Sequence, residues 1–347
     1  MPMLPPGYQA ASVDDEEALS QAISVLKELV GVHEKPRFFK YDPSLCAHQR
    51  NGQTACTRCI DACPAQAITS VGETVEVDSN RCQGGGICAT VCPAGAMRYA
   101  WPGVEDSLER VKRLISGYTE AGGRDPVLLV VPEAEGINAG DLPSNHLPFE
   151  VEELASVGLE FWLGALAYGA QQVRLHSVQP IPEAVESALQ QQISVGKQVL
   201  SALGYPSGAL QRSRATTLES EEGGQMPELD VATFAAMGSK RQLFYTALDH
   251  LYQQAERPRP MTLLEAGAPF GTVVVDQERC TLCSACIGAC PGQALQAGVD
   301  EPAIRFLEAN CLQCGLCTRT CPEDAIAISP RLLFAREKRD EVRLLHR

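Results

Sequence analysis

Two short cysteine-rich runs limit what this chain can fold into more than any other feature. Residues 280–291 read CTLCSACIGACP and residues 311–322 read CLQCGLCTRTCP, so both follow the pattern C-x2-C-x2-C-x3-C-P. Bacterial proteins use this pattern to hold cubane iron–sulfur clusters. Structural zinc also binds CxxC pairs, but zinc explains neither the middle cysteine nor the proline. We therefore expect the polypeptide around these runs to wrap inorganic clusters.

Two related runs lie nearer the N-terminus, and each departs from the pattern in one way. In the first, the loop between the first two cysteines is seven residues longer than its counterpart. Its cysteines are Cys46, Cys56, Cys59 and Cys63. The second reads RCQGGGICATVCP at 81–93, and Gly85 stands where the other runs have a cysteine. Its cysteines are Cys82, Cys88 and Cys92. One of four expected cluster sites therefore lacks a thiol.

The four runs form two copies of a larger unit. The three closely spaced cysteines of the first run precede those of the third by 227 residues, and the cysteines of the second run precede their counterparts in the fourth by 229. Each run follows an extended segment and precedes a short helical start, so we expect two copies of a two-cluster module. The predicted divisions are an N-terminal helical segment (1–36), a first module (37–103), an α/β domain (104–205), a linker and helix (206–270), a second module (271–330) and a basic tail (331–347).

The residues between the modules contain no cysteine and alternate apolar strands with helices. VLLVV at 127–131, HLPFEV at 146–151 and QVRLHSV at 172–178 are typical of strands. The stretch 152–170 is typical of a buried helix, and 182–205 of a long amphipathic helix. Strands that alternate with helices predict a small α/β layer around a parallel sheet.

Charge and cysteine usage narrow the class of protein. Lys and Arg total 29 against 43 Asp and Glu, a net charge of −14, which argues against nucleic acid as a partner. The first residues lack the basic and apolar regions of a secretory signal. The longest apolar run, at 161–170, is far short of the roughly 20 residues of a membrane span. We therefore expect a cytoplasmic protein without membrane insertion, whose thiols bind metal rather than form disulfides.

Three further segments carry weaker predictions. Apolar residues at helical spacing predict a helix over 14–30 that docks on the first module; they are Leu19, Ile23, Leu26 and Val30. A second helix is expected at 243–255, and 206–229 is expected to be a linker containing Glu219, Glu221 and Glu222. The arginines after 330 could dock an acidic partner, but a solvated helix explains them more simply.

Both modules resemble bacterial two-cluster ferredoxin domains, in which the last cysteine of each run binds the cluster of the other run. The predicted fold class is therefore two α+β ferredoxin-like cluster modules flanking a small α/β parallel-sheet domain. The resemblance implies four crossed ligand sets. They are Cys46, Cys56, Cys59 and Cys92; Cys63, Cys82 and Cys88; Cys280, Cys283, Cys286 and Cys321; and Cys290, Cys311, Cys314 and Cys317.

The set of three thiols leaves three outcomes open. The site could hold a three-iron cluster, a four-iron cluster whose last iron binds water or a nearby side chain, or no cluster at all. The expected cofactors are three [4Fe-4S] clusters and one [3Fe-4S] or incompletely ligated [4Fe-4S] cluster. His48 could replace Cys46 as a ligand, but an exposed loop histidine is the simpler interpretation.

The wider arrangement resembles bacterial cytoplasmic iron–sulfur cluster-binding proteins often encoded near formate dehydrogenase components. FKYDPSLCAHQRNGQTACTRCIDACP, LEFWLGALAYGAQQV and FLEANCLQCGLCTRTCPEDAI carry this resemblance. It implies electron relay to or from a larger redox enzyme, formate dehydrogenase or another oxidoreductase. The middle domain is loosely similar to the α/β subunit that links hydrogenases to heterodisulfide reductases, but 93–279 lacks the cysteines that hold the cluster of that subunit.

Two other functions remain open at this stage. The incomplete site at Gly85 would suit a redox sensor or an assembly factor, and a catalytic oxidoreductase would need a site in the middle domain. That domain has neither G-x-G-x-x-G nor a P-loop. Its polar residues His146, Glu150, Glu152 and Glu153 are better explained by a strand followed by a helix N-terminus, where glutamates are favoured. His176 fits a core or edge position. For a relay, we expect the two modules to touch and form one continuous path.

Overall fold

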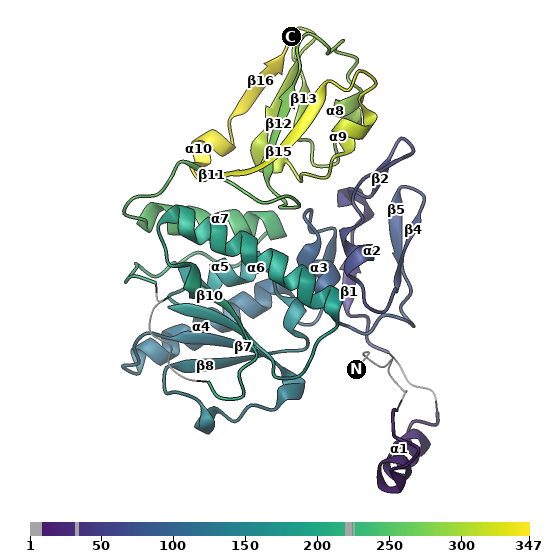
Figure 1. Ribbon diagram of the computed structural model, residues 1–347. Helices are drawn as coiled ribbons and strands as arrows, with labels where there is room; N and C mark the ends of the chain where they lie inside the picture. The colour runs from purple at the N-terminus through teal and green to yellow at the C-terminus, as the bar shows by residue number, and fades with distance from the viewer. Residues whose placement is uncertain (1–8, 32–34, 219–223, 225) are drawn as a thin grey trace.

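A four-stranded sheet occupies the middle of the chain in the computed structural model, which describes residues 9–31, 35–218, 224 and 226–347 (Figure 1). All four strands are parallel, in the order β10-β9-β7-β8. They are β7 (Val127–Pro132), β8 (His146–Val151), β9 (Gln172–His176) and β10 (Leu210–Ser213). The run VLLVVP is buried at every position, as expected for a strand covered on both faces. The predicted parallel sheet is confirmed.

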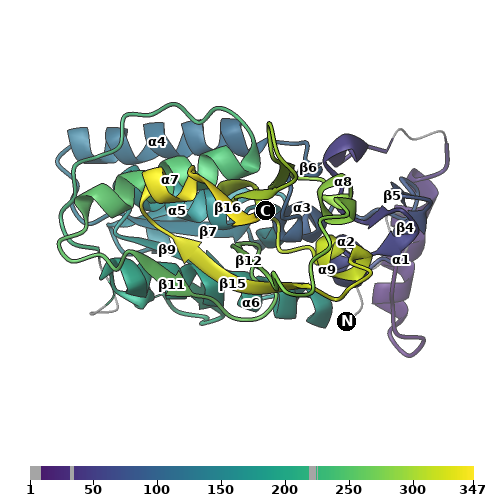
Figure 2. The same cartoon turned by 90° about the horizontal axis from the view of Figure 1, so that it is seen from above.

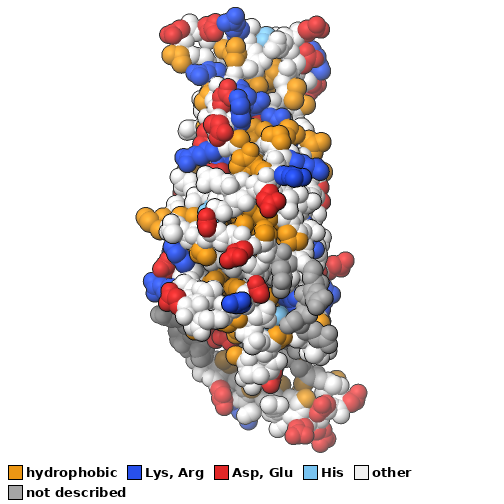
Figure 3. All heavy atoms as spheres, turned by 90° about the vertical axis from the view of Figure 1, so that its left-hand side faces the viewer, with side chains coloured by type: hydrophobic (Ala, Val, Ile, Leu, Met, Phe, Trp, Pro, Cys, Tyr) orange, Lys and Arg blue, Asp and Glu red, His pale blue; other side chains and the backbone are white. Residues whose placement is uncertain are grey.

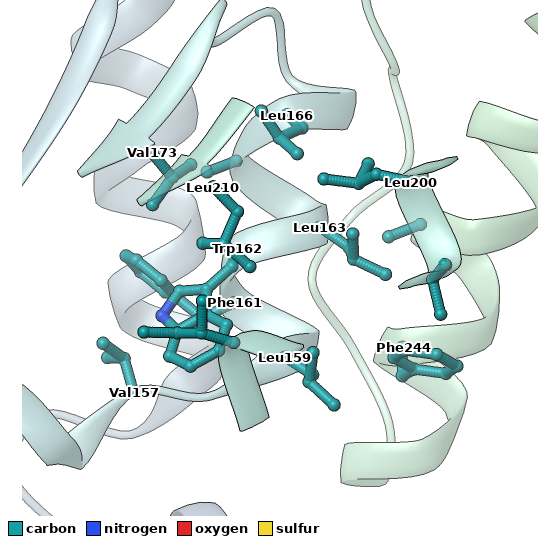
Figure 4. Close-up of a cluster of buried hydrophobic side chains, with 14 of the residues drawn as sticks. Val157, Leu159, Phe161, Trp162, Leu163, Leu166, Val173, Leu200, Leu210 and Phe244 are labelled. Atoms are coloured by element: carbon teal, nitrogen blue, oxygen red, sulfur yellow. The ribbon is translucent and has the colours of Figure 1, made fainter. Parts of the chain in front are cut away.

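Helices of this domain surround one helix that is buried along its whole length. The helices are α4 (Val104–Glu120), α5 (Leu159–Ala167), α6 (Glu183–Leu203) and α7 (Lys240–Gln254). Every residue of α5 is buried, and Phe161 and Trp162 have no exposed surface. Figure 4 shows these side chains among leucines and valines of neighbouring elements. This apolar cluster is the core that positions the cysteine-bearing segments around it.

The first cysteine-rich region forms three two-stranded sheets and two short helices. The strands pair antiparallel as β1 (Phe39–Tyr41) with β6 (Met97–Tyr99), β2 (Gln49–Arg50) with β3 (Gln53–Thr54), and β4 (Ile68–Val71) with β5 (Thr74–Val77). The helices are α2 (Arg58–Ala62) and α3 (Ile87–Val91), and they pack together. Each carries a cysteine, Cys59 on α2 and Cys88 on α3, so the strands hold two cysteine loops side by side.

The second cysteine-rich region repeats this plan with larger sheets. The strands are β11 (Met261–Leu263), β12 (Gly271–Val275), β13 (Leu295–Ala297), β14 (Ile304–Leu307), β15 (Ile326–Leu333) and β16 (Val342–His346). They form the sheets β11-β15-β12 and β13-β14-β16. The short helices are α8 (Ala285–Ala289), α9 (Leu316–Thr320) and α10 (Arg336–Arg339). Figure 2 shows β15 reaching from α9 toward α7, which joins this module to the middle domain.

The C-terminal residues differ from the predicted basic tail. Residues 331–347 complete the second module, because β15 continues to Leu333 and β16 pairs with β14. Glu308 accepts ion pairs from Arg331 and Arg343, at 2.7 and 2.6 Å. Buried Arg339 contacts Asp249 of α7 at 2.8 Å. These cations neutralise partners within the chain, so they are not a free docking surface. Acidic and basic side chains are also interspersed on the face in Figure 3.

The N-terminal helix forms, but it does not dock. Helix α1 (Glu16–Glu28) begins at Asp15, whose side chain accepts the amide of Ala18, and it contains no buried residue. The apolar residues predicted to pack on the first module, Leu19, Ile23 and Leu26, are 38–45% exposed. Figure 1 shows α1 standing away from the rest of the chain. Helical spacing therefore predicted the element correctly and its contacts wrongly.

Two elements between the modules were missed by the sequence analysis. Helix α4 buries Leu108, Val111 and Ile115 at helical spacing, in a stretch for which no element was predicted. Strand β10 lies in the predicted linker, and its short sequence LQRS pairs with β9 at the sheet edge. The glutamates predicted at 219–222 lie outside the described residues. Among the described helices, none is long and apolar enough to cross a membrane.

Two helical glycines test how tightly the core is packed. A Cβ at Gly196 of α6 would lie 2.6 Å from buried Leu210 and 3.1 Å from Leu159, whereas a Cβ at Gly117 of α4 would meet nothing within 4 Å. We expect Gly196→Val to destabilise the domain by about 1–3 kcal/mol through overpacking. Gly117→Ala should stabilise it by about 0.5–1 kcal/mol through helix propensity. The far-ultraviolet unfolding midpoint measures both, and equal shifts for the pair would contradict this account of the core.

Candidate iron–sulfur sites

Three hollows in the structure are each lined by cysteines from two different runs. Cys63, from the first run, lies with Cys82, Cys88 and Gly85 around a hollow of about 520 Å³. A second hollow, of about 380 Å³, and a third, of about 360 Å³, are each lined by four cysteines. These are Cys46, Cys56, Cys59 and Cys92 in the second, and Cys290, Cys311, Cys314 and Cys317 in the third. The groups coincide with three of the expected ligand sets.

The remaining set contains Cys286 of α8 and three other thiols near it. Burial, together with the charges of these three thiolates, raises the pKa of Cys286 to about 11. Those neighbours are Cys280, Cys283 and Cys321, the other members of its expected set. Among the described residues, no three His, Cys, Asp or Glu side chains converge on a point that would hold a single metal ion. The thiols instead surround volumes larger than one ion.

The backbone of three cysteine loops has the same unusual conformation. In all three loops, the residues on either side of the second cysteine position of the run have positive φ, between 50° and 80°. That position is Cys283, Cys314 or Gly85. The pairs are Leu282 and Ser284, Gln313 and Gly315, and Gly84 and Gly86. Left-handed residues turn successive N–H groups toward one side, which forms a concavity for an anion. The loop around Gly85 therefore keeps the shape of a cluster loop although its thiol is missing.

The last cysteine of each run has a matching amide partner. Its sulfur accepts a hydrogen bond from a backbone N–H four or five residues later, at 3.3–3.4 Å. The pairs are Ala67 with Cys63, Met97 with Cys92, Ala294 with Cys290, and Ala325 with Cys321. A residue with positive φ, third after each cysteine, makes this return possible. Such N–H···S bonds are one of the means by which proteins set cluster potentials.

The electrostatics of the thiols also fit iron ligation. Burial is the main cause that raises the pKa of Cys88 to about 12 and of Cys314 to about 11, with neighbouring thiolates adding to both shifts. The pKa of Cys59 and of Cys317 is raised for the same reasons. Crowded, buried thiolates are unfavourable unless a positive charge lies among them, and coordinated iron supplies that charge. The donor set therefore fits iron–sulfur clusters, which would supply one-electron chemistry when bound.

His48 differs from the expected exposed loop residue. It is 1% exposed, its Nδ1 lies 2.8 Å from the carbonyl oxygen of Cys56, and its Nε2 lies 2.7 Å from the hydroxyl of Ser70. Both ring nitrogens are engaged, so the histidine fixes the long loop after Cys46 rather than replacing the thiol. Cys46 itself lines the second hollow with the other three members of its set.

The polar residues of the middle domain do not assemble into one site. His146 begins β8, whereas Glu152 and Glu153 follow its end. A strand of this length separates them by about 16 Å. Burial, and then the charge of Arg174, lowers the pKa of His146 to about 4, so it is neutral at physiological pH. His176 is buried at the end of β9, far along the sheet from His146. His146 lies in the predicted strand, but Glu152 and Glu153 do not lie at the predicted helix N-terminus. They precede the 3-10 turn Leu154–Ser156, and α5 begins only at Leu159.

A half-buried cation that the sequence did not reveal joins the first module to α7. Lys240 donates hydrogen bonds to the carbonyl oxygens of Ala89 and Thr90, at 2.7 and 2.6 Å, at the end of α3. Its Nζ lies 3.8 Å from buried Glu160, whose pKa is raised by burial. The next residue, Arg241, donates to carbonyl oxygens of Ala309 and Cys311 in the second module. In the sequence, the only sign of this connection between the modules is that Lys240 and Arg241 are adjacent.

Two stretches of the chain match the family described as 4Fe-4S dicluster domain, over residues 54–96 and 279–326. No curated protein matches the chain. The chain therefore contains two ferredoxin-type domains that bind iron–sulfur clusters. Cys46 lies outside the first match and is assigned to its set by the hollow that it lines.

Substitution of two equivalent cysteines tests the crossed ligation. Cys63 lines the hollow with Gly85, and Cys92 lines the neighbouring one. A three-iron cluster has a spin-half signal when oxidised. Cys63→Ala should abolish such a signal from the Gly85 site, because two thiolates cannot hold the cluster. Cys92→Ala should retain that signal and open a corner in the neighbouring cluster. Low-temperature electron paramagnetic resonance separates the cases, and the reverse pattern would show that each run serves its own cluster.

Proposed function

We propose that this chain is an electron carrier in which four iron–sulfur clusters form one row. In this proposal, the crossed cysteine sets are the ligands, and the clusters are three [4Fe-4S] centres and one centre with three thiolates at the Gly85 site. The two ferredoxin-type domains support iron–sulfur electron transfer. The observation that carries the proposal is the contact between the two modules, because separate modules could not pass electrons onward.

The contact brings one cysteine set of each module close to the other. Arg319 of α9 donates a hydrogen bond to the carbonyl oxygen of Thr54 in β3, at 2.6 Å. Thr54 lies two residues before Cys56, and the charge of Cys56 is one of the causes that raise the pKa of Cys314. The two thiols are therefore within electrostatic range across the module boundary. This supports electron transfer between the two inner clusters.

Contacts within each module continue the row outward. The thiolates acting on Cys59 come from its own set and from Cys88 of the Gly85 site. Those acting on Cys317 come from its own set and from Cys286 of the last set. The proposed order runs from the Gly85 site, through the set of Cys59, to the set of Cys317 and the set of Cys286. The outer clusters would then exchange electrons with partners.

The partner belongs to the proposal as well. The resemblance described above favours a larger cytoplasmic redox enzyme, formate dehydrogenase or another oxidoreductase, as donor or acceptor. Paired arginines make the C-terminal segment unsuitable for docking an acidic partner. The exposed apolar residues of α1 are a more accessible contact for such an enzyme.

A second candidate function rests on Gly85. A cluster with one open corner gains and loses iron more readily than a fully ligated one, which suits a redox sensor. Two observations would separate the functions. Reversible reduction of all clusters without loss of iron favours a relay, whereas interconversion of the cluster under physiological oxidants favours a sensor.

Cluster content is the first test of the relay. Anaerobically reconstituted protein should contain about 15 or 16 irons with a similar number of sulfides, from three full clusters and one with three or four irons. Iron and sulfide analysis gives the total, and electron paramagnetic resonance of the reduced protein should show interacting clusters. A total near eight irons would restrict the clusters to one module and end the proposal of a continuous row.

The contact between modules provides the second test. Arg319→Ala removes an exposed hydrogen bond worth about 1 kcal/mol and should slow electron redistribution between modules after rapid reduction, followed optically. Arg279→Ala is the matched control, since its 4.0 Å ion pair with Asp324 stays within the second module. The iron content of both variants should equal that of the unmodified protein. Equal rates in the two variants would mean that this contact does not support transfer.

A further inference from the structure

The hollow beside Gly85 has one wall without a side chain. Gly85 lines it together with Cys63, Cys82 and Cys88, whereas four cysteines line the hollows of two other sets. The corner that a thiolate fills in those sets is therefore open to a small ligand. The walls of the hollow are largely apolar, with Phe38, Phe39, Ile68 and Ile87 among them.

One buried hydroxyl in this lining has no partner. Tyr99 of β6 is 8% exposed, and its Oη has no hydrogen-bond partner among the described residues. An unsatisfied buried hydroxyl costs about 1–3 kcal/mol, so such groups usually face a ligand or water. After burial and two nearby carboxylates, the charges of Cys82 and Cys88 are the next causes that raise the pKa of Tyr99. The hydroxyl therefore lies within electrostatic range of this cysteine set.

A second unsatisfied atom lies in the cysteine loop itself. The side-chain oxygen of Gln83, between Cys82 and Gly84, is buried and has no partner among the described residues. A glutamine oxygen alone does not distinguish this site, because Gln313 beside a complete set has one as well. The Gly85 site is distinguished by having both a glutamine oxygen and a tyrosine hydroxyl without partners among the described residues. Tyr41, the tyrosine that lines the second hollow, accepts the amide of Val75, so its hydroxyl is engaged.

We propose that Tyr99 and Gln83 are positioning residues for the ligand position that Gly85 leaves open. The Tyr99 hydroxyl donates a hydrogen bond to a small oxygen ligand, water or hydroxide, and the Gln83 side-chain oxygen accepts one from it. The oxygen ligand completes the coordination that three thiolates leave unfinished, so these two side chains help to retain the fourth iron. This inference rests on the proposed function, because it requires a cluster at the Gly85 site.

A second, more polar hollow adjoins this one. Tyr99 lines both, and the walls of the second include Lys40, Glu105, Glu160 and Lys240. Polar hollows accommodate ordered water. The Tyr99 side chain therefore lies beside a source of the proposed water ligand.

Titration with iron tests the role of Tyr99. Anaerobic protein is oxidised with ferricyanide until the spin-half signal of the three-iron form is maximal, and the ferricyanide is removed. Ferrous iron is then added stepwise. One ferrous ion enters the open corner, and a second supplies the electron that brings the oxidised cluster to the four-iron 2+ state and leaves as ferric iron. Loss of the signal measures rebinding of the fourth iron. Tyr99→Phe keeps the ring packing and removes only the hydroxyl. Because partners of metal ligands change affinity by about 10–100-fold, we expect this variant to need at least about tenfold more iron. Gln83→Leu should shift the titration in the same direction.

Two control variants show the results expected for an unchanged site and for a fully ligated one. Tyr41→Phe removes a hydroxyl beside the neighbouring four-cysteine hollow and should titrate like the unmodified protein. Gly85→Cys should show no spin-half signal, since a fourth thiolate holds the iron. The backbone there lies outside the left-handed region, unlike Gly84 and Gly86, so the φ angle imposes no strain on a side chain.

The outcomes separate this inference from the relay. A Tyr99→Phe titration that coincides with that of the unmodified protein would overturn it, as would a signal that added iron never removes. In either case a total of about 15 or 16 irons would leave the relay intact. A cluster total confined to the second module would instead overturn both proposals.

Discussion

Buried thiols require positive charge, and this requirement organises both ends of the chain. Fifteen cysteines are gathered in two regions whose interiors are lined by sulfur as much as by hydrocarbon. Burial and mutual repulsion raise the pKa of several of them. Without iron, the interiors of these regions would contain crowded thiols at positions where apolar side chains would pack more favourably. Ligands that must be deprotonated couple metal binding to folding, so we expect these regions to be less stable without clusters.

The repeated backbone explains how one site can lose a ligand without losing its loop. Positive φ values on both sides of Gly85 match those around Cys283 and Cys314, and the amide that bonds to Cys63 matches its three counterparts. The loop conformation therefore does not depend on the thiol: glycines take the positive-φ positions around Gly85, and Leu282 and Ser284 take them around Cys283. Beside Gly85, two buried polar atoms of the described residues lack partners, Tyr99 Oη and Gln83 Oε1.

Sequence reasoning succeeded where composition alone decides burial, because the apolar run before Pro132 predicted a buried parallel strand. The crossed cysteine sets that the resemblance implies coincide with the cysteines lining three hollows, and their role as ligands stays a prediction. Prediction failed where the position of an element depends on the segment that it packs against or pairs with. The apolar stripe of α1 resembles a docking face, but the helix contains no buried residue; LQRS resembles a linker, but it pairs with β9. Arg331, Arg339 and Arg343 are not solvated as expected, because they pair with Glu308 and Asp249, which precede the C-terminal segment in the sequence. Arg336, in contrast, is exposed as expected.

Helix α7 has a consequence for how steadily electrons could move. Lys240 and Arg241 hold the first and second modules at one end of the helix, and Asp249 and Tyr245 grip Arg339 further along it. Both ferredoxin-type domains thus contact the same helix, which has fifteen residues. The rate of electron tunnelling falls steeply with the distance between clusters. If one helix fixes that distance, the rate of transfer between the modules would not depend on solvent viscosity. In carriers whose domains must move together before transfer, it would.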